Sequence, residues 1–194
     1  MMTGCSARRA PRLGGGRDEA LIVTAPASMR IVLTVNGRPV EADIEPREML
    51  LDFVRDRLGL TGAKRSCDMQ VCGACTVLLD GLPISACCTL AYEARGREVL
   101  TIEGLTSDGR PHPLQEAFID HAAVQCGFCT PGMILTALVL LRETPTPDAG
   151  HVKAHMNGTL CRCTGYWKII DAVVDAGARL QADAPRLRAS GADR

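Results

Sequence analysis

Four cysteines in the first half of the chain have the spacing of a metal-cluster site. They form the pattern C-x4-C-x2-C-x11-C and are Cys67, Cys72, Cys75 and Cys87. A C-x4-C-x2-C run with a distant fourth cysteine is typical of plant-type [2Fe–2S] sites, where each of two irons needs two thiolates. The small residues Gly73 and Ala74 would let backbone N–H groups approach the sulfurs. A structural zinc site is the alternative, although zinc loops less often combine an x4 step with an x2 step.

A second group of four cysteines consists of two tight and unequal pairs. Two residues separate the first pair and one residue separates the second; the four are Cys126, Cys129, Cys161 and Cys163. By count alone they could bind either zinc or another iron–sulfur cluster. Each pair directly precedes an expected helix, one starting at Pro131 and one near Tyr166. Helix N-termini carry partial positive charge, so this placement favours a centre that becomes more negative on reduction.

The chain contains 10 cysteines, and their clustering argues against a disulfide framework. Cysteines so close in sequence are poor partners for each other, because a disulfide needs a specific Cα separation. Metal-bound thiolates in a reducing compartment are the better interpretation, so we expect a cytoplasmic protein. Arg8 and Arg9 precede an apolar stretch that is shorter than an export signal needs, so periplasmic export by a twin-arginine signal is not favoured.

Composition argues against two classes of function. The 194 residues include 22 basic and 22 acidic side chains, so the formal net charge is zero. A nucleic-acid-binding protein needs a basic surface, so we expect no nucleic-acid partner. The longest apolar run, at 133–141, is shorter than the roughly 18 residues that a membrane span requires. We therefore expect no membrane span and a buried helix over that run.

The first part of the chain has the patterning of a small α+β domain, expected over residues 29–106. Alternating apolar and polar residues flank Asn36-Gly37 and Asp80-Gly81, which are strong signals for tight hairpin turns. Between the two hairpins, apolar residues recur at helical spacing. The predicted elements are strands at 30–35 and 38–44, a helix at 49–60, a hairpin at 76–85 and a strand at 98–105.

The second part of the chain is predicted to be helical. Residues 107–113 are Gly-, Pro- and polar-rich and predict a linker. A helical domain is expected over 114–182, with helices at 114–124, 131–143, 147–156 and 166–182. The remaining residues lack helix or strand periodicity, and we expect a disordered extension at 1–28 and a mobile tail at 183–194.

Three stretches of sequence resemble one protein family. CGACTVLLDG (72–81), QCGFCTPG (125–132) and LCRCTGY (160–166) resemble the iron–sulfur subunit of the molybdenum hydroxylases. This is the family of xanthine dehydrogenase, aldehyde oxidoreductase and carbon monoxide dehydrogenase. The resemblance implies a ferredoxin-like β-grasp domain followed by a four-helix domain. It also implies that each set of four cysteines ligates one [2Fe–2S] cluster, the second of them nearest the molybdenum centre.

The resemblance implies an electron-transfer subunit without a substrate site of its own. A molybdopterin cofactor in a separate large subunit would oxidise the substrate. Single electrons would then pass through the second and the first cluster to FAD in a medium subunit, or to another acceptor. Gln125 and Cys163 match family positions that lie against the pterin. A free-standing [2Fe–2S] carrier or redox sensor is the alternative function.

Two residues depart from the family pattern. Thr159 stands where asparagine is common, and Cys88 stands where leucine is common, directly after Cys87. We expect Cys88 to be a small, buried apolar thiol. Cys5 lies outside both cysteine motifs. Because eight cysteines suffice for two clusters, the four histidines are expected to be surface or helix-packing residues; they are His112, His121, His151 and His155.

Overall fold

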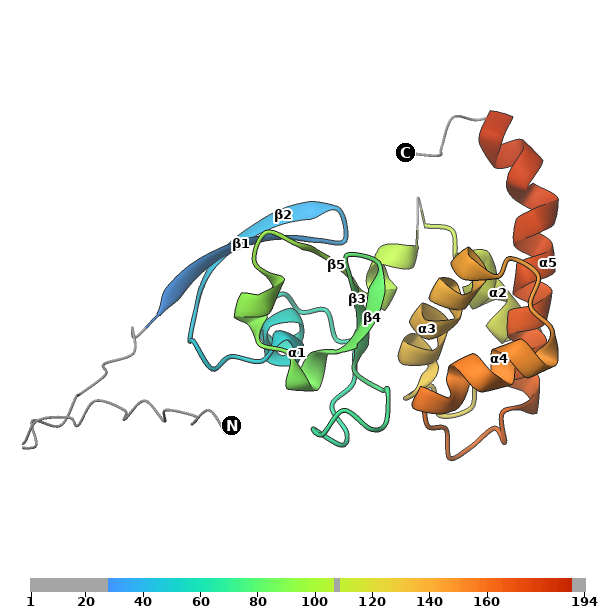
Figure 1. Cartoon of the computed structure of the whole chain (residues 1–194), viewed down its shortest axis with the longest axis horizontal. Coiled ribbons are helices and arrows are strands. Elements are labelled where there is room, and N and C mark those ends of the chain that lie inside the picture. Colours follow the sequence, from blue (N-terminus) through green and yellow to red (C-terminus); the bar gives the residue numbers. More distant parts are fainter. Residues whose placement is uncertain (1–27, 107–108, 190–194) are drawn as a thin grey trace, which may run out of the picture.

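The computed structural model describes residues 28–106 and 109–189, with side chains described up to residue 182. A five-stranded sheet with a short helix lies beside a group of four helices (Figure 1). Apart from Ser28, the extension predicted at 1–28 lies outside the described residues, and so do parts of the predicted linker and tail.

The sheet is mixed and has the strand order β2-β1-β5-β3-β4. β1 (Met29–Val35) pairs antiparallel with β2 (Arg38–Ile44), and β3 (Thr76–Leu79) pairs antiparallel with β4 (Leu82–Ser85). β5 (Glu98–Leu100) lies between the two hairpins, parallel to β1 and antiparallel to β3. The predicted β-grasp arrangement is confirmed.

Both predicted hairpin turns are confirmed. The central residues Asn36 and Gly37 have φ of 51° and 74°, and Asp80 and Gly81 have φ of 49° and 82°. Two successive residues with positive φ give a turn whose twist matches that of the strands, which is why Asn-Gly and Asp-Gly suit these positions.

The helix predicted at 49–60 differs from the structure. It is α-helical only over α1 (Leu50–Asp52) and continues as a π-helical turn, η1 (Phe53–Arg57). The Leu58 N–H donates to the carbonyl of Phe53, five residues back, at 3.3 Å. Gly59, with a φ of 69°, then ends the turn.

The strand predicted at 98–105 is also shorter, because it ends at Leu100. At the next residue, a side chain and not a neighbouring strand is the hydrogen-bond partner of the backbone: Asn36 Oδ1 accepts from the Thr101 N–H at 2.8 Å. Its Nδ2 donates to the Thr101 hydroxyl at 3.0 Å. A 3₁₀ turn, η4 (Ile102–Leu105), follows in place of the strand; another, η3 (Ala91–Ala94), precedes β5.

Four α-helices form the second unit, close to their predicted positions. They are α2 (Pro113–Asp120), α3 (Thr130–Glu143), α4 (Ala149–His155) and α5 (Trp167–Ala189). α2 ends earlier than predicted, since Ala122 has a φ of 49°. α5 continues to Ala189, past the predicted end at 182. No helix in the described part of the chain is long and apolar enough to cross a membrane.

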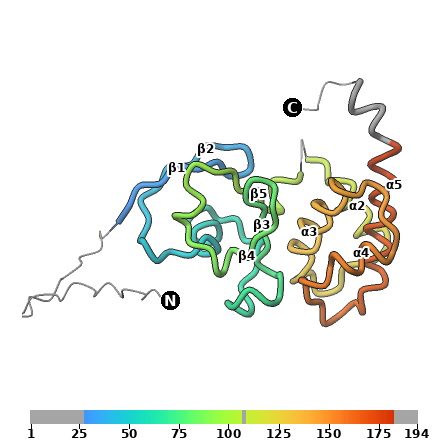
Figure 2. The backbone as a smooth tube through the Cα atoms, viewed as in Figure 1, coloured from blue at the N-terminus to red at the C-terminus, as the bar shows by residue number. Residues whose placement is uncertain are grey.

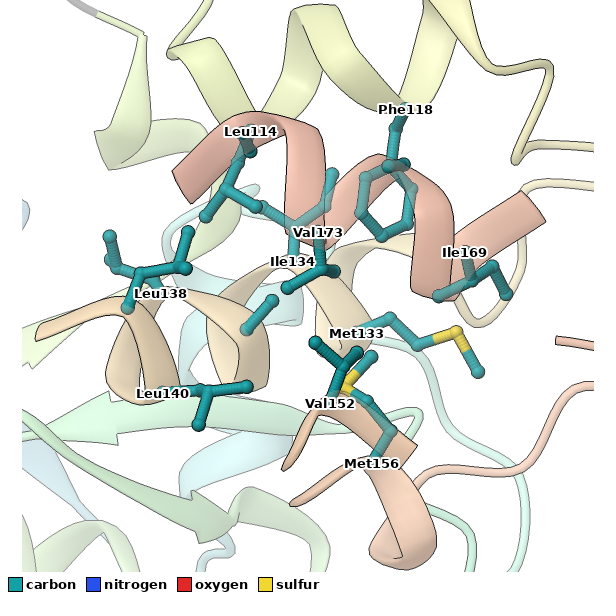
Figure 3. Packing of buried hydrophobic residues seen from close by; sticks show 14 of the residues in the cluster. Leu114, Phe118, Met133, Ile134, Leu138, Leu140, Val152, Met156, Ile169 and Val173 are labelled. Carbon is teal, nitrogen blue, oxygen red and sulfur yellow. The ribbon is translucent and has the colours of Figure 1, made fainter. Parts of the chain in front are cut away.

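The four helices bury a common apolar core (Figure 3). Leu114 and Phe118 of α2 belong to this core with Met133 of α3 and Ile169 of α5, and all four side chains are fully buried. Each such side chain stabilises the fold by about 1.5–3 kcal/mol. α3 is buried from Gly132 to Leu141, as predicted for the apolar run at 133–141.

Ion pairs on the surface of this unit join α2 to α5. His121 Nε2 lies 2.9 Å from Asp175 Oδ2. Arg179 pairs with both Asp120 and Asp175, each at 2.6 Å. Pairs this exposed contribute at most about 1 kcal/mol each, so the apolar core remains the main source of stability.

The two units share strand β3, which is buried at all four positions. Leu78 packs into the helical core, whereas Val77 and Leu79 pack into the core under the sheet. α3 lies directly against this strand (Figure 2). In the first turn of α3, Gly132 lies so close to the Gly73 carbonyl that a side chain at 132 would collide with it.

We expect Gly132→Ala to lower the free energy of unfolding by about 1–3 kcal/mol, because the new methyl group meets backbone that cannot move aside. Helix propensity alone predicts the opposite sign. Chemical denaturation of the full chain measures the change. Gly158→Ala is the matched control, since a Cβ there meets nothing within 4 Å. Equal losses in the two variants would contradict the close packing inferred here.

A second prediction concerns His112, the N-cap residue of α2. Its Nδ1 accepts from the Leu114 N–H at 3.1 Å, and its own N–H donates to Gln115 Oε1 at 2.8 Å. Burial lowers the pKa of His112, and the nearby Arg142 guanidinium lowers it further. The unfolded state therefore binds a proton more readily than the folded state.

The contribution of His112 to stability is thus complete above the ordinary histidine pKa of about 6.5. It is lost progressively as the pH falls below that value, until the folded state titrates as well. Unfolding measured between about pH 8 and pH 5 should show this loss. His112→Asn should reduce it, because asparagine keeps an acceptor for the cap but does not titrate. A slope unchanged by His112→Asn but removed by His151→Asn, on the exposed side of α4, would contradict the assignment.

Candidate metal centres

Two of the first four cysteines lie at the end of the β3–β4 hairpin. Cys75 directly precedes β3, and Cys87 lies in the 3₁₀ turn η2 (Ala86–Cys88) that follows β4. The hairpin register pairs Thr76 with Ser85, and the Ala86 N–H donates to the Cys75 carbonyl at 3.4 Å, so Cys87 lies one residue beyond the position opposite Cys75. The Cys87 thiol is near enough to Cys75 to act on its pKa.

The loop before β3 carries the other two cysteines, Cys67 and Cys72, and Cys72 is near enough to act on the pKa of Cys67. The loop turns back sharply at Asp68, which has a φ of 51°. Arg65 holds its entrance through ion pairs with Asp52 of α1 and with Asp68, the latter at 2.9 Å. The sequence spacing alone did not indicate this anchor.

The backbone of this loop stabilises negative charge on Cys67. Hydrogen bonds from the N–H groups of Met69, Val71 and Cys72 lower the pKa of Cys67 to about 6. Burial has the opposite effect on Cys75 and raises its pKa to about 12. A buried thiol of this kind gives up its proton when a metal ion takes the proton's place.

The second four cysteines lie where two loops meet before two helices. Cys129 is the N-cap residue of α3, and Cys126 precedes it in the loop after α2. Cys161 and Cys163 lie between the 3₁₀ turn η5 (Met156–Gly158) and α5. The predicted placement before the two helices is confirmed. Tyr166, with a φ of 72°, closes the second loop, and its hydroxyl accepts from the Cys161 N–H at 2.8 Å.

The sulfurs of this set lie close together. Cys163 Sγ and Cys126 Sγ are 3.6 Å apart, and both residues are exposed. Cys161 is near enough to act on the pKa of Cys129, which is buried. Burial raises the pKa of Cys129 to about 12. Burial acts in the same direction on Cys161, but hydrogen bonds led by those from the Thr164 hydroxyl and N–H outweigh it and lower the pKa.

Sulfur pairs suit a binuclear cluster. Two thiolates on one tetrahedral metal lie about 3.7 Å apart when each metal–sulfur bond is about 2.3 Å, and a [2Fe–2S] cluster takes two thiolates on each iron. The separation of 3.6 Å between Cys126 and Cys163 fits this requirement. In the part of the chain that the structure describes, no three or more His, Cys, Asp or Glu side chains converge on the position of a single metal ion.

A direct backbone contact joins the two cysteine sets. The N–H of Leu160, just before Cys161, donates to the carbonyl of Cys72 at 2.9 Å. Next to this bond, Gly73 has a φ of 69°, and a Cβ there would lie 2.9 Å from the hydroxyl of buried Thr159. Only glycine therefore allows the two loops to come this close.

The sequence did not predict this junction. There, Gly73 was expected to let backbone N–H groups approach the sulfurs. The structure places Gly73 against the backbone carbonyl of Gly158 instead, at 2.7 Å from an added Cβ. The small residues in the runs CGAC and NGTLC were the available signal. Runs that combine glycine with cysteine indicate close approach of backbone, but not which segments approach each other.

Cys88 is exposed, so the expectation of a buried thiol was wrong. Successive residues of a 3₁₀ turn point about 120° apart, so the side chain after buried Cys87 turns outward. The two sulfurs nevertheless lie 3.6 Å apart. Their hydrogen bond raises the pKa of Cys88.

The surface around the outer pair of the second set is apolar. Gln125, next to Cys126, is exposed, as is Cys163. The nearby side chains of Phe128, Leu160 and Trp167 are 44%, 52% and 75% exposed. Leu160 and Trp167 also line a cavity of about 580 Å³ between α4 and the start of α5. Apolar residues exposed in this number indicate a surface that meets another protein.

Comparison with known protein families agrees with this division of the chain. Residues 33–99 match the 2Fe-2S iron-sulfur cluster binding domain, and residues 101–174 match the [2Fe-2S] binding domain. The first match covers the sheet and its cysteine loop, and the second covers most of the helical unit.

Relatives of similar length are subunits of oxidoreductase complexes. The chain is 48% identical over 143 residues to the nicotinate dehydrogenase small FeS subunit of Eubacterium barkeri, covering 74% of this chain and 91% of that subunit. It is 39% identical over 172 residues to the aldehyde oxidoreductase iron-sulfur-binding subunit of Escherichia coli K12, covering 81% of this chain and 75% of that subunit.

Solved structures share the fold. Quinoline 2-oxidoreductase from Pseudomonas putida 86 contains a chain that is 47% identical with a TM-score of 0.78; the match covers 81% of this chain and 98% of that one. Aldehyde oxidoreductase from Desulfovibrio gigas is 39% identical with a TM-score of 0.76, over 82% of this chain and 18% of that longer one. The chain therefore belongs to the family of small iron–sulfur subunits of the molybdenum hydroxylases, the electron-transfer subunits of these multi-subunit oxidoreductases.

Proposed function

We propose that the chain passes single electrons from a molybdopterin cofactor in a large partner subunit toward FAD in a medium subunit, or toward another acceptor. One observation carries this proposal: the cysteines of each set lie close enough together to act on one another's pKa, two of the sulfurs lie 3.6 Å apart, and a backbone hydrogen bond joins the two sets. When bound, each [2Fe–2S] cluster accepts and releases one electron at a time.

The four cysteines of each set are the proposed ligands of one cluster. The first cluster is held by Cys67, Cys72, Cys75 and Cys87. The second cluster is held by Cys126, Cys129, Cys161 and Cys163. Cysteines clustered as metal ligands favour a reducing compartment, and we place the complex in the cytoplasm.

The exposure of the sulfurs supports a direction for electron flow. In the second set, the exposed pair Cys126 and Cys163 faces outward and accepts electrons from the partner. A short path leads from the other two cysteines of the set, Cys129 and Cys161, to the first set. Leu160 directly precedes Cys161 in the chain, and its N–H donates to the Cys72 carbonyl. Cys72 is a proposed ligand of the first cluster. A few covalent bonds and one hydrogen bond therefore connect a proposed ligand of one cluster to a proposed ligand of the other.

The partner surfaces lie at the two ends of this path. The large molybdopterin-binding subunit would dock on the apolar face around Trp167, with Gln125 and Cys163 against the pterin. At the other end, Met69 and Val71 are 66% and 57% exposed beside Cys67. Their exposure supports docking of the FAD-binding subunit or another acceptor there.

Low-temperature EPR of the dithionite-reduced complex should show two distinguishable S = 1/2 iron–sulfur signals, each near one spin per chain. Cys75→Ser should remove one signal and Cys129→Ser the other, because each variant removes a buried ligand from one set. Cys5→Ser, outside both motifs, is the control and should leave both signals intact.

Other outcomes distinguish the alternatives. A colourless protein that contains zinc and lacks both signals would overturn the electron-transfer proposal in favour of a structural metal site. A stable iron-loaded protein with both signals, which never copurifies with a molybdenum subunit, would favour the free-standing carrier or sensor.

Docking at the second cluster can be tested separately from cluster binding. Trp167→Ala should weaken assembly with the large subunit at least about tenfold, because an exposed tryptophan at the centre of an interface commonly contributes 1–2 kcal/mol or more. Iron content should remain unchanged. Val32→Ala removes an exposed apolar side chain from β1, far from this face, and serves as the control. Equal affinity for wild type and Trp167→Ala, measured by titrating the purified subunits, would place the interface elsewhere.

A further inference from the structure

Cys88 lies beside the first cysteine set and has no role in the function proposed above. It closes the 3₁₀ turn η2, and its sulfur lies 3.6 Å from that of Cys87. Cys67 and Asp68, in the loop that faces this turn, are also near enough for their charges to act on Cys88. Cys88 thus lies at the solvent side of the first set, beside one of its proposed ligands.

The surroundings of the two neighbouring cysteines distinguish their roles. Cys87 is 6% exposed and near enough to Cys75 to act on its pKa, so it faces the rest of the set. Cys88 is exposed, and its sulfur contacts the set at Cys87. A thiolate that ligates a cluster carries no proton, so in this contact the S–H of Cys88 is the donor and the Cys87 sulfur is the acceptor.

We propose that Cys88 tunes the first cluster by donating an S–H hydrogen bond to the sulfur of Cys87. This inference rests on the proposed role of Cys87 as a cluster ligand. Reduction adds one electron to the cluster and increases the negative charge on its ligand sulfurs. A donor to one of these sulfurs stabilises the reduced state more than the oxidised state, so it raises the reduction potential. The Cys88 proton stays on its own sulfur throughout, and no covalent bond changes.

The hydrogen bond also favours the direction of electron flow. The Cys88 sulfur contacts that of Cys87, a member of the first set. Cys88 therefore acts on the first cluster and shifts the shared electron toward it. Cys88 is a positioning residue, since it acts through Cys87.

The test is an EPR-monitored redox titration of the assembled complex, with the second cluster as an internal reference. Cys88→Ala should lower the reduced-to-oxidised ratio of the first cluster roughly threefold at a fixed potential, which corresponds to about 28 mV. The second cluster should titrate as in the wild type. Cys88→Ser should retain most of the wild-type potential, because its hydroxyl is also a donor.

Thr89→Val is the matched control for loosening of the turn. The Thr89 hydroxyl donates to the Ser85 carbonyl at 3.1 Å in the same turn, without reaching Cys87. A potential that is unchanged in Cys88→Ala, or one that shifts equally in Thr89→Val, would overturn the proposal. So would loss of the first cluster in Cys88→Ala together with its retention in Cys87→Ala, because Cys88 would then be the ligand. If the wild type lacked the first-cluster signal, the proposed function itself would fail, and the two failures are therefore distinguishable.

Discussion

The structure depends on one close approach of backbone to backbone, between the loop of Cys72 and the loop that enters Cys161. A single N–H···O=C bond from Leu160 marks the contact, and glycine at 73 and 132 leaves the space for it. β3 begins just after the Cys72 loop, and Gly132 of α3 lies against the Gly73 carbonyl, so both elements pack beside this contact. Electrons tunnel efficiently only over short distances, so a subunit with two redox sites needs such a junction.

Each cysteine set balances two opposing electrostatic requirements. Burial protects a site from water but disfavours negative charge on sulfur, as for Cys75 and Cys129. N–H and hydroxyl groups directed at Cys67 and Cys161 have the opposite effect and favour the thiolate. Every set thus combines one sulfur that resists ionisation with one that accepts it readily. The same combination lets a charged site lie partly inside a domain of ordinary apolar packing.

Much of the fold could be predicted from the sequence, because local rules decide it. Asn36-Gly37 and Asp80-Gly81 determine two hairpins, and the apolar run at 133–141 determines a buried helix. The end of β5 could not be predicted, since it depends on the side chain of Asn36, which is distant in sequence. The π-helical turn after α1 has no local signal that we recognise. Such differences arise where contacts distant in sequence override local preference.

The candidate sites show the same limit. Spacing was enough to group the cysteines into two sets and to place one set before two helices. It could not place the sulfurs of a set relative to one another, because their positions depend on the hairpin and on the meeting of two loops. The expectation that Cys88 is buried was wrong for a related reason. The sequence shows that the residue is small and apolar, but the direction in which its side chain leaves the 3₁₀ turn decides its exposure.

The burial of β3 on both faces has a consequence for how the molecule unfolds. Leu78 belongs to the core of the helices, while Val77 and Leu79 on the same strand belong to the core under the sheet. Neither unit can open without exposing part of the other's interior, so the chain should melt in one cooperative transition. The two family domains are separate segments of the sequence, but we expect them to unfold together as one cooperative unit.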